Sequence, residues 1–254
     1  MVACPCSEQH PLRTIGLQLC SPGTAGGYTL FAPVAYTTTY LIDIFGRRVN
    51  SWPSSHQPAF SSDLLSTGQL LRPAGFGNLD FVAPGSGGLI QIFEWDGTLT
   101  WSYQYSNSQQ CQHHDVEGLP NGNVLLIAWE KRTQDQAIQA GRIPANVRAQ
   151  GLWPDSIAEI EPTGLDSGDV VWLWRSWDHL VQDHDPTKDN YVVDTADHPG
   201  RLDINYPPGT SQIDWLHFNG IDYDPALDQI VVSSRALDEV DGLGRSVSLV
   251  DQIR

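Results

Sequence analysis

Short runs of alternating apolar and polar residues, separated by Gly, Asp, Asn and Pro, recur along most of the chain. Alternation with a period of two is typical of β-strands that have one buried face, and Asp-Gly or Asn-Gly between two such runs predicts a tight hairpin. The pattern is clear in 88–101, where Asp96-Gly97 separates two apolar runs. It predicts a strand-rich, antiparallel protein.

Two kinds of hairpin alternate along the sequence. In the first kind the second strand ends in Trp, and the pattern predicts it at 39–52, 88–101 and 156–174. The second kind is predicted at 64–71, 119–126 and 224–232. One hairpin of each kind makes a four-stranded unit, and a unit that repeats about every 50 residues with a terminal aromatic is typical of a β-propeller blade. Gly68 and Gly122, at equivalent turns, are 54 residues apart.

The predicted fold is all-β, a partial β-propeller of four-stranded antiparallel sheets. The hairpins account for about three to four blades, whereas propellers close with roughly four to eight. We expect one incomplete propeller domain at 28–254 after an N-terminal segment at 1–27, because an all-β domain of this size need not divide. An insertion rich in Asp, His and Pro interrupts the repeat at about 175–213. Only 132–150 favours a short helix or loop.

The charge of the chain excludes some partners. Lys and Arg number 14 against 30 Asp and Glu, which gives a net charge of -16 and argues against nucleic acid or an anionic membrane as partner. An anionic substrate would therefore need a local basic pocket. No apolar run reaches the roughly 18 residues of a spanning helix, and the first residues lack the basic and apolar regions of a secretory signal. The compartment stays open.

The four cysteines do not predict a metal site. Cys4, Cys6 and Cys20 crowd the N-terminus and Cys111 stands alone, with no second Cys or His pair at zinc-ligand spacing nearby. A local disulfide and free thiols are both compatible with this spacing.

A pair of histidines marks the start of a predicted inner strand, and the inner strands of a propeller converge on its channel. His113 and His114 precede the Asn121-Gly122 hairpin. Adjacent residues of a strand face opposite sides, so we expect one of the pair to face the channel. We favour His114, because Asp115 beside it suits an imidazole held in one tautomer. The alternative is a structural pair, with one ring in solvent and the other bonded to a backbone carbonyl.

His217 and Arg235 stand at the two ends of a later hairpin. His217 repeats the position of His114, which favours a shared channel site, although a histidine after Trp-Leu is also a common interior residue. A guanidinium binds oxyanions while an imidazole beside it exchanges a proton, as transfer of a sulfuryl or phosphoryl group requires. Trp215 can stack on an aromatic substrate, but packing between blades is the commoner role of a Trp.

The insertion holds a third cluster of polar residues. Its acidic residues lack the glycine and the final glutamate of an EF-hand loop, and its histidines match no usual zinc or iron spacing. We therefore expect no metal here, and a polar segment that folds over one mouth of the channel and contacts the substrate. The residues concerned are His179, Asp183, His184, Asp185, Asp189 and His198.

Three ordered motifs resemble the arylsulfotransferase (aryl-sulfate sulfotransferase) family: 113–125, 177–191 and 217–235. The resemblance spans roughly 28–240. It implies a six-bladed propeller that moves a sulfuryl group from a phenolic sulfate to a second phenol through a sulfated histidine, without a nucleotide donor or other cofactor. It also implies a periplasmic or secreted protein.

The resemblance assigns roles to individual residues. His114, His217 and Arg235 match the catalytic channel residues that bind the sulfuryl oxygens and assist proton transfer. His113, His179 and Trp215 are the expected substrate-binding residues. The partners implied are small molecules, an aryl sulfate and a phenol.

Two departures from the family bear on activity. The resemblance places the nucleophilic histidine downstream of the arginine that Arg235 matches, yet no histidine follows His217, and 241–250 does not resemble the relatives. We therefore expect a C-terminally truncated chain with no appreciable turnover. A noncatalytic propeller binding module or pseudoenzyme fragment is the alternative, and a metal-dependent hydrolase is the third hypothesis.

Overall fold

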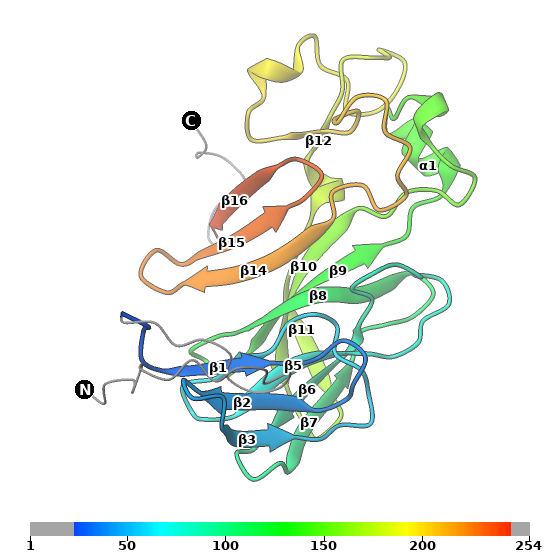
Figure 1. The fold of residues 1–254 in the computed structure, drawn as a ribbon. Helices are drawn as coiled ribbons and strands as arrows, with labels where there is room; N and C mark the ends of the chain where they lie inside the picture. The colour runs from blue at the N-terminus through cyan, green and yellow to red at the C-terminus, as the bar shows by residue number, and fades with distance from the viewer. Residues whose placement is uncertain (1–22, 245–254) are drawn as a thin grey trace, which may run out of the picture.

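The computed structural model describes residues 23–244 and shows four successive antiparallel sheets (Figure 1). The first holds β1 (Tyr28–Phe31), β2 (Thr39–Asp43) and β3 (Arg48–Trp52). The second holds β4 (Asp63–Leu64), β5 (Leu70–Gly75), β6 (Gly88–Phe93) and β7 (Leu99–Gln104). The third holds β8 (Gln110–Gly118), β9 (Val124–Glu130), β10 (Asp155–Pro162) and β11 (Gly168–Arg175). The fourth holds β14 (Phe218–Asp224), β15 (Gln229–Ser234) and β16 (Glu239–Gly244).

Within each of these sheets the strands follow one another in the order of the sequence, and each pairs with the next. The predicted turn chemistry makes the hairpins. Between β6 and β7, Gly97 takes a φ of 89° that other residues rarely adopt, and its N–H donates to the Glu94 carbonyl at 3.0 Å. The Asp96 carboxylate accepts the N–H of Thr98 at 2.9 Å. The prediction of an all-β, partial propeller of antiparallel sheets is confirmed.

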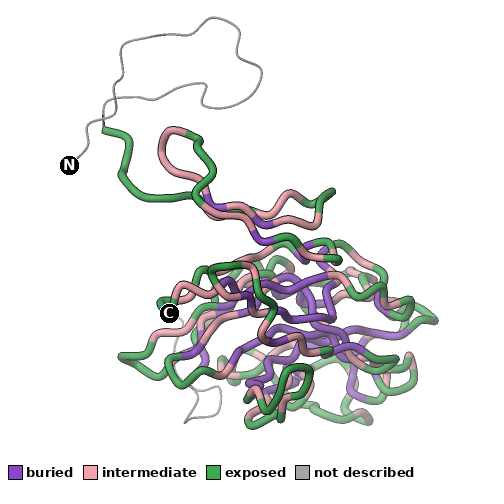
Figure 2. The backbone as a smooth tube through the Cα atoms, turned by 90° about the horizontal axis from the view of Figure 1, so that it is seen from below, coloured by how far each residue is buried: buried purple, intermediate pink, exposed green. Residues whose placement is uncertain are grey.

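The apolar core lies between successive sheets, as expected for stacked blades. Leu41 and Trp52 of the first sheet pack with Leu70 and Phe93 of the second. Because side chains alternate along a strand, the next residue, Leu71, faces the opposite way and packs toward the third sheet. The largest cluster joins the third and fourth sheets. Figure 2 shows that the buried positions concentrate in the middle sheets.

The strand-ending tryptophans of the first two sheets each bond to the sheet that follows. Trp52 of β3 donates its indole N–H to the carbonyl of Glu94 at 2.9 Å, and Trp101 of β7 donates to the carbonyl of Ser167 at 3.0 Å. Both acceptors lie at the hairpin between the last two strands of the following sheet. The repeated terminal aromatic of the sequence therefore has a structural role between blades.

The insertion after β11 packs beside α1 (Gln134–Gln139) and η1 (Pro144–Asn146) (Figure 1). Buried Arg142 donates to the carbonyls of Ile204 and Thr210, which fastens the insertion to the loop after α1. The prediction of a short helix within 132–150 agrees with α1. The insertion contains η2 (Ser176–His179), β12 (Leu180–Val181), η3 (Thr195–Asp197) and β13 (Leu202–Asp203).

The thiol of Cys111 is free and buried, and burial raises its pKa. Cys4, Cys6 and Cys20 lie outside the described residues, as does most of the predicted N-terminal segment. Within residues 23–244, no helix is long and apolar enough to cross a membrane.

Candidate functional site

Unusual backbone conformations occur within or shortly before three inner strands. Phe60, His114 and His217 adopt positive φ angles of 81°, 51° and 52°. Such angles are rare outside Gly and cluster at functional sites, since the surrounding fold must compensate for their strain. The pairing register shifts at the same places, between Gln112 and Val116 in β8 and at Phe218–Gly220 in β14. At His114 and His217 the backbone thus turns the side chains out of the regular strand alternation.

These three side chains meet. The ring centroids of His114 and His217 lie 4.7 Å apart with planes inclined by 68°, and the ring of Phe60 lies 5.8 Å from that of His114. The histidines are only 9% and 7% exposed, whereas Phe60 is 50% exposed. Two nearly buried imidazoles from neighbouring inner strands therefore face each other beside an accessible aromatic ring.

Asp214 orients His217. One carboxylate oxygen of Asp214 bonds to Nδ1 of His217, and the other accepts the indole N–H of Trp129 at 2.9 Å. Because a carboxylate accepts, Nδ1 of His217 carries a proton and Nε2 is the nitrogen left for a ligand. The arrangement matches the Asp-His pairs that hold a catalytic imidazole in one orientation.

His114 is held from the side by His113. The two Nδ1 atoms lie 3.0 Å apart, so Nε2 is again the free nitrogen. His113 is completely buried: its ring stacks on Trp129 at 3.9 Å, and its Nε2 lies 2.8 Å from the carboxyl group of Asp155. His113 therefore contacts His114 from inside the protein, and we do not retain it among the substrate contacts.

Gly85 forms the surface against which the His114 ring rests. It adopts a φ of 81°, and its carbonyl accepts the N–H of His114 at 2.8 Å. A Cβ placed on Gly85 would lie 2.3 Å from Cε1 of His114. A residue without a side chain is therefore required at this position.

Arg235 stands next to His217. Its N–H donates to the His217 carbonyl at 3.2 Å, which fixes the end of β15 beside the site, and its side chain is exposed. Among the described residues, no carboxylate lies within ion-pair distance of its guanidinium. The positive charge of Arg235 contributes to the low pKa of His114, so it acts on the site and is free to meet an anion.

The pKa of His114 is lowered to about 4, mainly by burial and then by the neighbouring His217 and Arg235, whereas Asp214 acts in the opposite direction. His114 is therefore neutral near pH 7. In that state it contributes a hydrogen bond, while the cationic attraction comes from Arg235.

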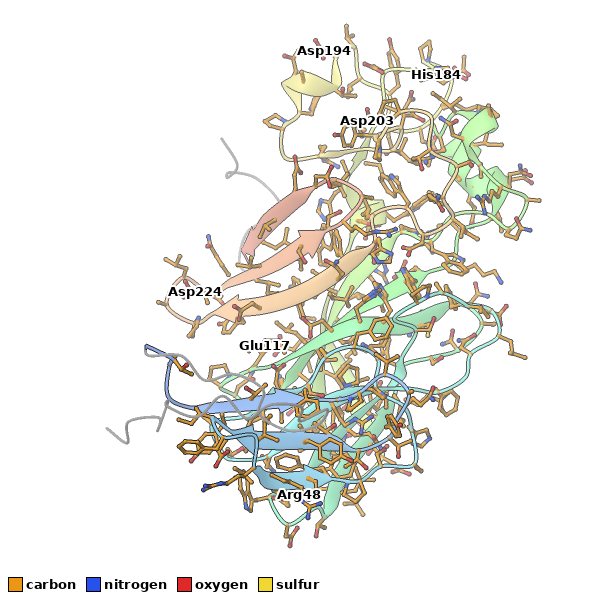
Figure 3. The ribbon with its side chains drawn as sticks, in the orientation of Figure 1. Arg48, Glu117, His184, Asp194, Asp203 and Asp224 are labelled. Carbon is orange, nitrogen blue, oxygen red and sulfur yellow. The ribbon has the colours of Figure 1, made fainter. Side chains whose placement is uncertain are left out.

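A row of carboxyl groups continues along the same inner strands. Asp63 lies on β4, Asp115 and Glu117 on β8, and Asp222 on β14; Figure 3 labels Glu117. Burial, followed by mutual repulsion, raises the pKa of Asp63 to about 6 and that of Glu117 to about 7. Asp115 also joins strands, since it accepts the N–H of Ile221 at 2.9 Å.

Two other predicted contacts lie apart from the histidine pair. The ring centroids of His179 and Trp174 lie 5.2 Å apart, and within the described part of the chain His179 makes no hydrogen bond, ion pair or ring contact with His114 or His217. Trp215 is 1% exposed and donates its indole N–H to the Tyr206 carbonyl at 2.8 Å. Its ring therefore packs in the core, which is the commoner role of Trp. No face of the ring is accessible to a substrate.

The Asp-rich loop of the insertion is organised around a side chain. The amide of Gln182 donates to the carbonyls of Asp185 and Asp189 at 2.9 and 3.1 Å and accepts the N–H of His184 at 2.9 Å. In the part of the chain that the structure describes, no group of three or more His, Cys, Asp or Glu residues could hold a metal ion. Figure 3 shows His184 and Asp194 in the insertion, away from Glu117.

Sequence reasoning missed four residues that support the site: Gly85, Trp129, Asp155 and Asp214. Asp214 carries a usable signal, because it precedes His217 by three residues. Gly85 lies in the glycine-rich run 85–88. Trp129 and Asp155 read as ordinary strand residues, and only the pairing of β9 with β10 brings both next to His113.

One of three comparisons with known proteins identifies a family. The sequence model of the arylsulfotransferase (ASST) family matches residues 81–250, more than half of the chain. None of the curated proteins matches. Among solved structures, a protein of unknown function from Bacteroides caccae is similar with a TM-score of 0.47 and 12% identity. The match covers 91% of this chain and 58% of that one.

Proposed function

The chain belongs to the arylsulfotransferase family, and we propose that it binds the sulfuryl group of a phenolic sulfate between His114, His217 and Arg235. The supporting observation is the pair of imidazoles 4.7 Å apart, each with Nδ1 engaged by a neighbour and Nε2 free, beside an exposed guanidinium. Planar guanidinium groups suit tetrahedral oxyanions, and fixed donors stabilise the charge that spreads over the sulfuryl oxygens during transfer.

The proposed reaction is a double displacement without a nucleotide donor. A histidine nitrogen attacks sulfur, the bond between sulfur and the phenolic oxygen breaks, and the phenolate leaves with the electron pair and takes up a proton from an imidazolium. The acceptor phenol then returns a proton to that imidazole and attacks sulfur, which breaks the nitrogen–sulfur bond. Sulfur keeps its oxidation state throughout.

The contacts suggest a different role in the reaction for each residue. His217, backed by Asp214, suits the proton carrier, because the carboxylate stabilises the imidazolium that forms. Neutral His114 and the charged Arg235 suit the sulfuryl oxygens. The half-exposed ring of Phe60 suits the aryl group. His113 is completely buried behind His114, and His179 and Trp215 lie in other packing, so none of the three enters this proposal as a contact of the substrate.

A double displacement requires a nucleophile that holds the sulfuryl group between the two phenols. No histidine follows His217 in these 254 residues, so the sulfuryl acceptor of this polypeptide would have to be a histidine already present. We propose that these residues bind aryl sulfates. The same observation favours a second candidate, a noncatalytic binding module that recognises the sulfate ester.

The two candidates differ in one assay. The purified chain is incubated with 4-nitrophenyl sulfate, with and without a second phenol, and release of 4-nitrophenol is followed. Acceptor-dependent release that falls at least about 100-fold in His217→Ala supports the transferase and shows that the present histidines suffice. Binding of the ester without release supports the binding module. Absence of both rejects the proposed site.

A further inference from the structure

A chain of three side chains connects the interior of the third sheet to the candidate site. Asp155 of β10 lies 2.8 Å from Nε2 of His113, and Nδ1 of His113 lies 3.0 Å from Nδ1 of His114. Asp155 and His113 are fully buried, and His114 is 9% exposed. Water therefore has little access to these protons.

The contact between the two Nδ1 atoms holds a single proton, so the tautomers of the histidines are linked. With Asp155 ionised, His113 donates from Nε2 to the carboxylate and accepts at Nδ1, and His114 keeps its proton on Nδ1. The free Nε2 of His114 is then an acceptor. With Asp155 protonated, the carboxyl group donates to Nε2 of His113, each proton shifts along the chain, and Nε2 of His114 becomes a donor.

The surroundings of Asp155 favour one of these two protonation states. Its Oδ2 atom has no hydrogen-bond partner among the described residues, and the charge of Asp214 is close by. Burial and Asp214 raise the pKa of Asp155, although backbone N–H groups of Phe218 and His217 act in the opposite direction. Burial also lowers the pKa of His113. A buried carboxylate with one unpaired oxygen is costly, so a pair without charge is favoured.

We propose that Asp155 is protonated and that, through His113, it fixes His114 with Nε2–H directed into the site as a hydrogen-bond donor. Asp155 and His113 are then positioning residues. They give a neutral imidazole a permanent donor, which an anionic oxygen requires, because a lone pair at this point would repel it. The use of that donor for a sulfuryl oxygen rests on the proposed function; the tautomer itself does not.

The test reads the tautomer directly. The chain is labelled with 15N at histidine, and two-bond proton–nitrogen correlations are recorded at pH 7, with the His114 signals assigned from their loss in His114→Gln. The proposal expects the Nε2–H tautomer for His114. In Asp155→Asn it expects the same tautomer, because the amide N–H donates to His113 as the protonated carboxyl group does.

An Nδ1–H tautomer in the unsubstituted chain would overturn the proposal. So would inversion of the tautomer in Asp155→Asn, which an ionised Asp155 predicts. If Asp155→Asn fails to fold, the spectrum of the unsubstituted chain still decides. Neither measurement needs a substrate. A finding that the chain does not bind aryl sulfates would therefore refute the proposed function without affecting the result for the tautomer.

Discussion

At the scale of single residues, the site depends on backbone positions that a regular strand does not offer. His114 and His217 both adopt the left-handed conformation at which the pairing register shifts, and this brings together two rings that strict alternation would separate. Gly85 leaves the space into which His114 turns. Each feature costs stability, and each is placed where it sets the direction of a polar side chain.

Substitution Gly85→Ala tests that space. We expect a loss of about 1–3 kcal/mol in the free energy of unfolding and a weaker affinity for aryl sulfates, because the new Cβ meets the His114 ring and φ is strained. Thermal denaturation and ligand titration measure the two effects.

Gly68→Ala is the matched control, since Gly68 has a similar φ of 86° with nothing within 4 Å of its Cβ. It shares the backbone strain and lacks the clash. Equal affinity in the two variants would mean that the space beside His114 does not matter.

The sequence identified the residues at the front of the site better than those behind them. His114, His217 and Arg235 stand at strand ends, and the structure brings the two histidines into contact with Arg235 beside them. Asp155 and Trp129 could not be found in this way. Their relation to the site comes from pairing between β9 and β10 and from packing, neither of which leaves a local pattern.

At the scale of elements, β8 connects the second, third and fourth sheets. It pairs with β9, and Asp115 on it accepts the N–H of Ile221 in β14 at 2.9 Å and that of Val116 at 3.0 Å. This carboxylate supplies a partner to a backbone group that lies between two blades. Loss of this carboxylate would remove the side-chain acceptor of the Ile221 N–H.

Asp115→Ala should therefore lower the free energy of unfolding by about 1–3 kcal/mol, the usual cost of an unsatisfied buried donor. Thermal denaturation measures the loss. Asp222→Ala is the comparison, because Asp222 belongs to the same acidic row but is exposed and bonds only the adjacent N–H of Tyr223. A loss in Asp222→Ala as large as that in Asp115→Ala would show that the contact between strands is not the cause.

The strands were predictable, whereas the arrangement of the insertion was not. Period-two alternation and Asp-Gly or Asn-Gly turns located the hairpins, because a strand with one buried face must show that pattern. The insertion is held by buried Arg142 and by the amide of Gln182, which bond backbone carbonyls far from them in sequence. Such contacts depend on the folded chain and leave no periodicity.

At the scale of the whole molecule, the acidic row makes stability depend on pH. The pKa of Glu117 is raised to about 7, first by burial and then by Asp63, Asp222 and Asp115. A carboxyl group whose pKa is raised on folding destabilises the folded state fully above that pKa. The penalty shrinks as pH falls through 7 and vanishes below the unfolded value near 4.5.

Glu117→Gln should remove this penalty. We expect the variant to be more stable than the unsubstituted chain at pH 8, by on the order of 1 kcal/mol because the side chain is partly solvated, and most of this difference should be lost at pH 5. Melting temperatures from pH 5 to 8 give the difference. All other ionisable groups are the same in both proteins, so their effects cancel in the comparison. A difference that does not change with pH would contradict this origin.

The whole molecule also presents a strongly acidic surface, with a net charge of -16, to an anionic ligand. Binding must therefore depend on local cations and donors, and Arg235 is the exposed cation beside the histidine pair. Arg48 of β3 is an exposed arginine that Figure 3 shows at the opposite end of the molecule from the insertion. Removal of a positive charge beside the histidine pair can therefore be compared with removal of a positive charge far from it.

Equilibrium binding of 4-nitrophenyl sulfate to the unsubstituted chain, Arg235→Gln and Arg48→Gln tests the proposed site most directly, with 4-nitrophenol as the ligand that lacks the sulfuryl group. We predict that Arg235→Gln weakens binding of the ester at least about tenfold, since a charge-assisted contact contributes roughly 1.5–3 kcal/mol. Arg48→Gln should change it less than about twofold, and 4-nitrophenol should bind all three proteins equally. Equal affinity of the ester for Arg235→Gln and the unsubstituted chain would contradict a sulfuryl site between His114, His217 and Arg235.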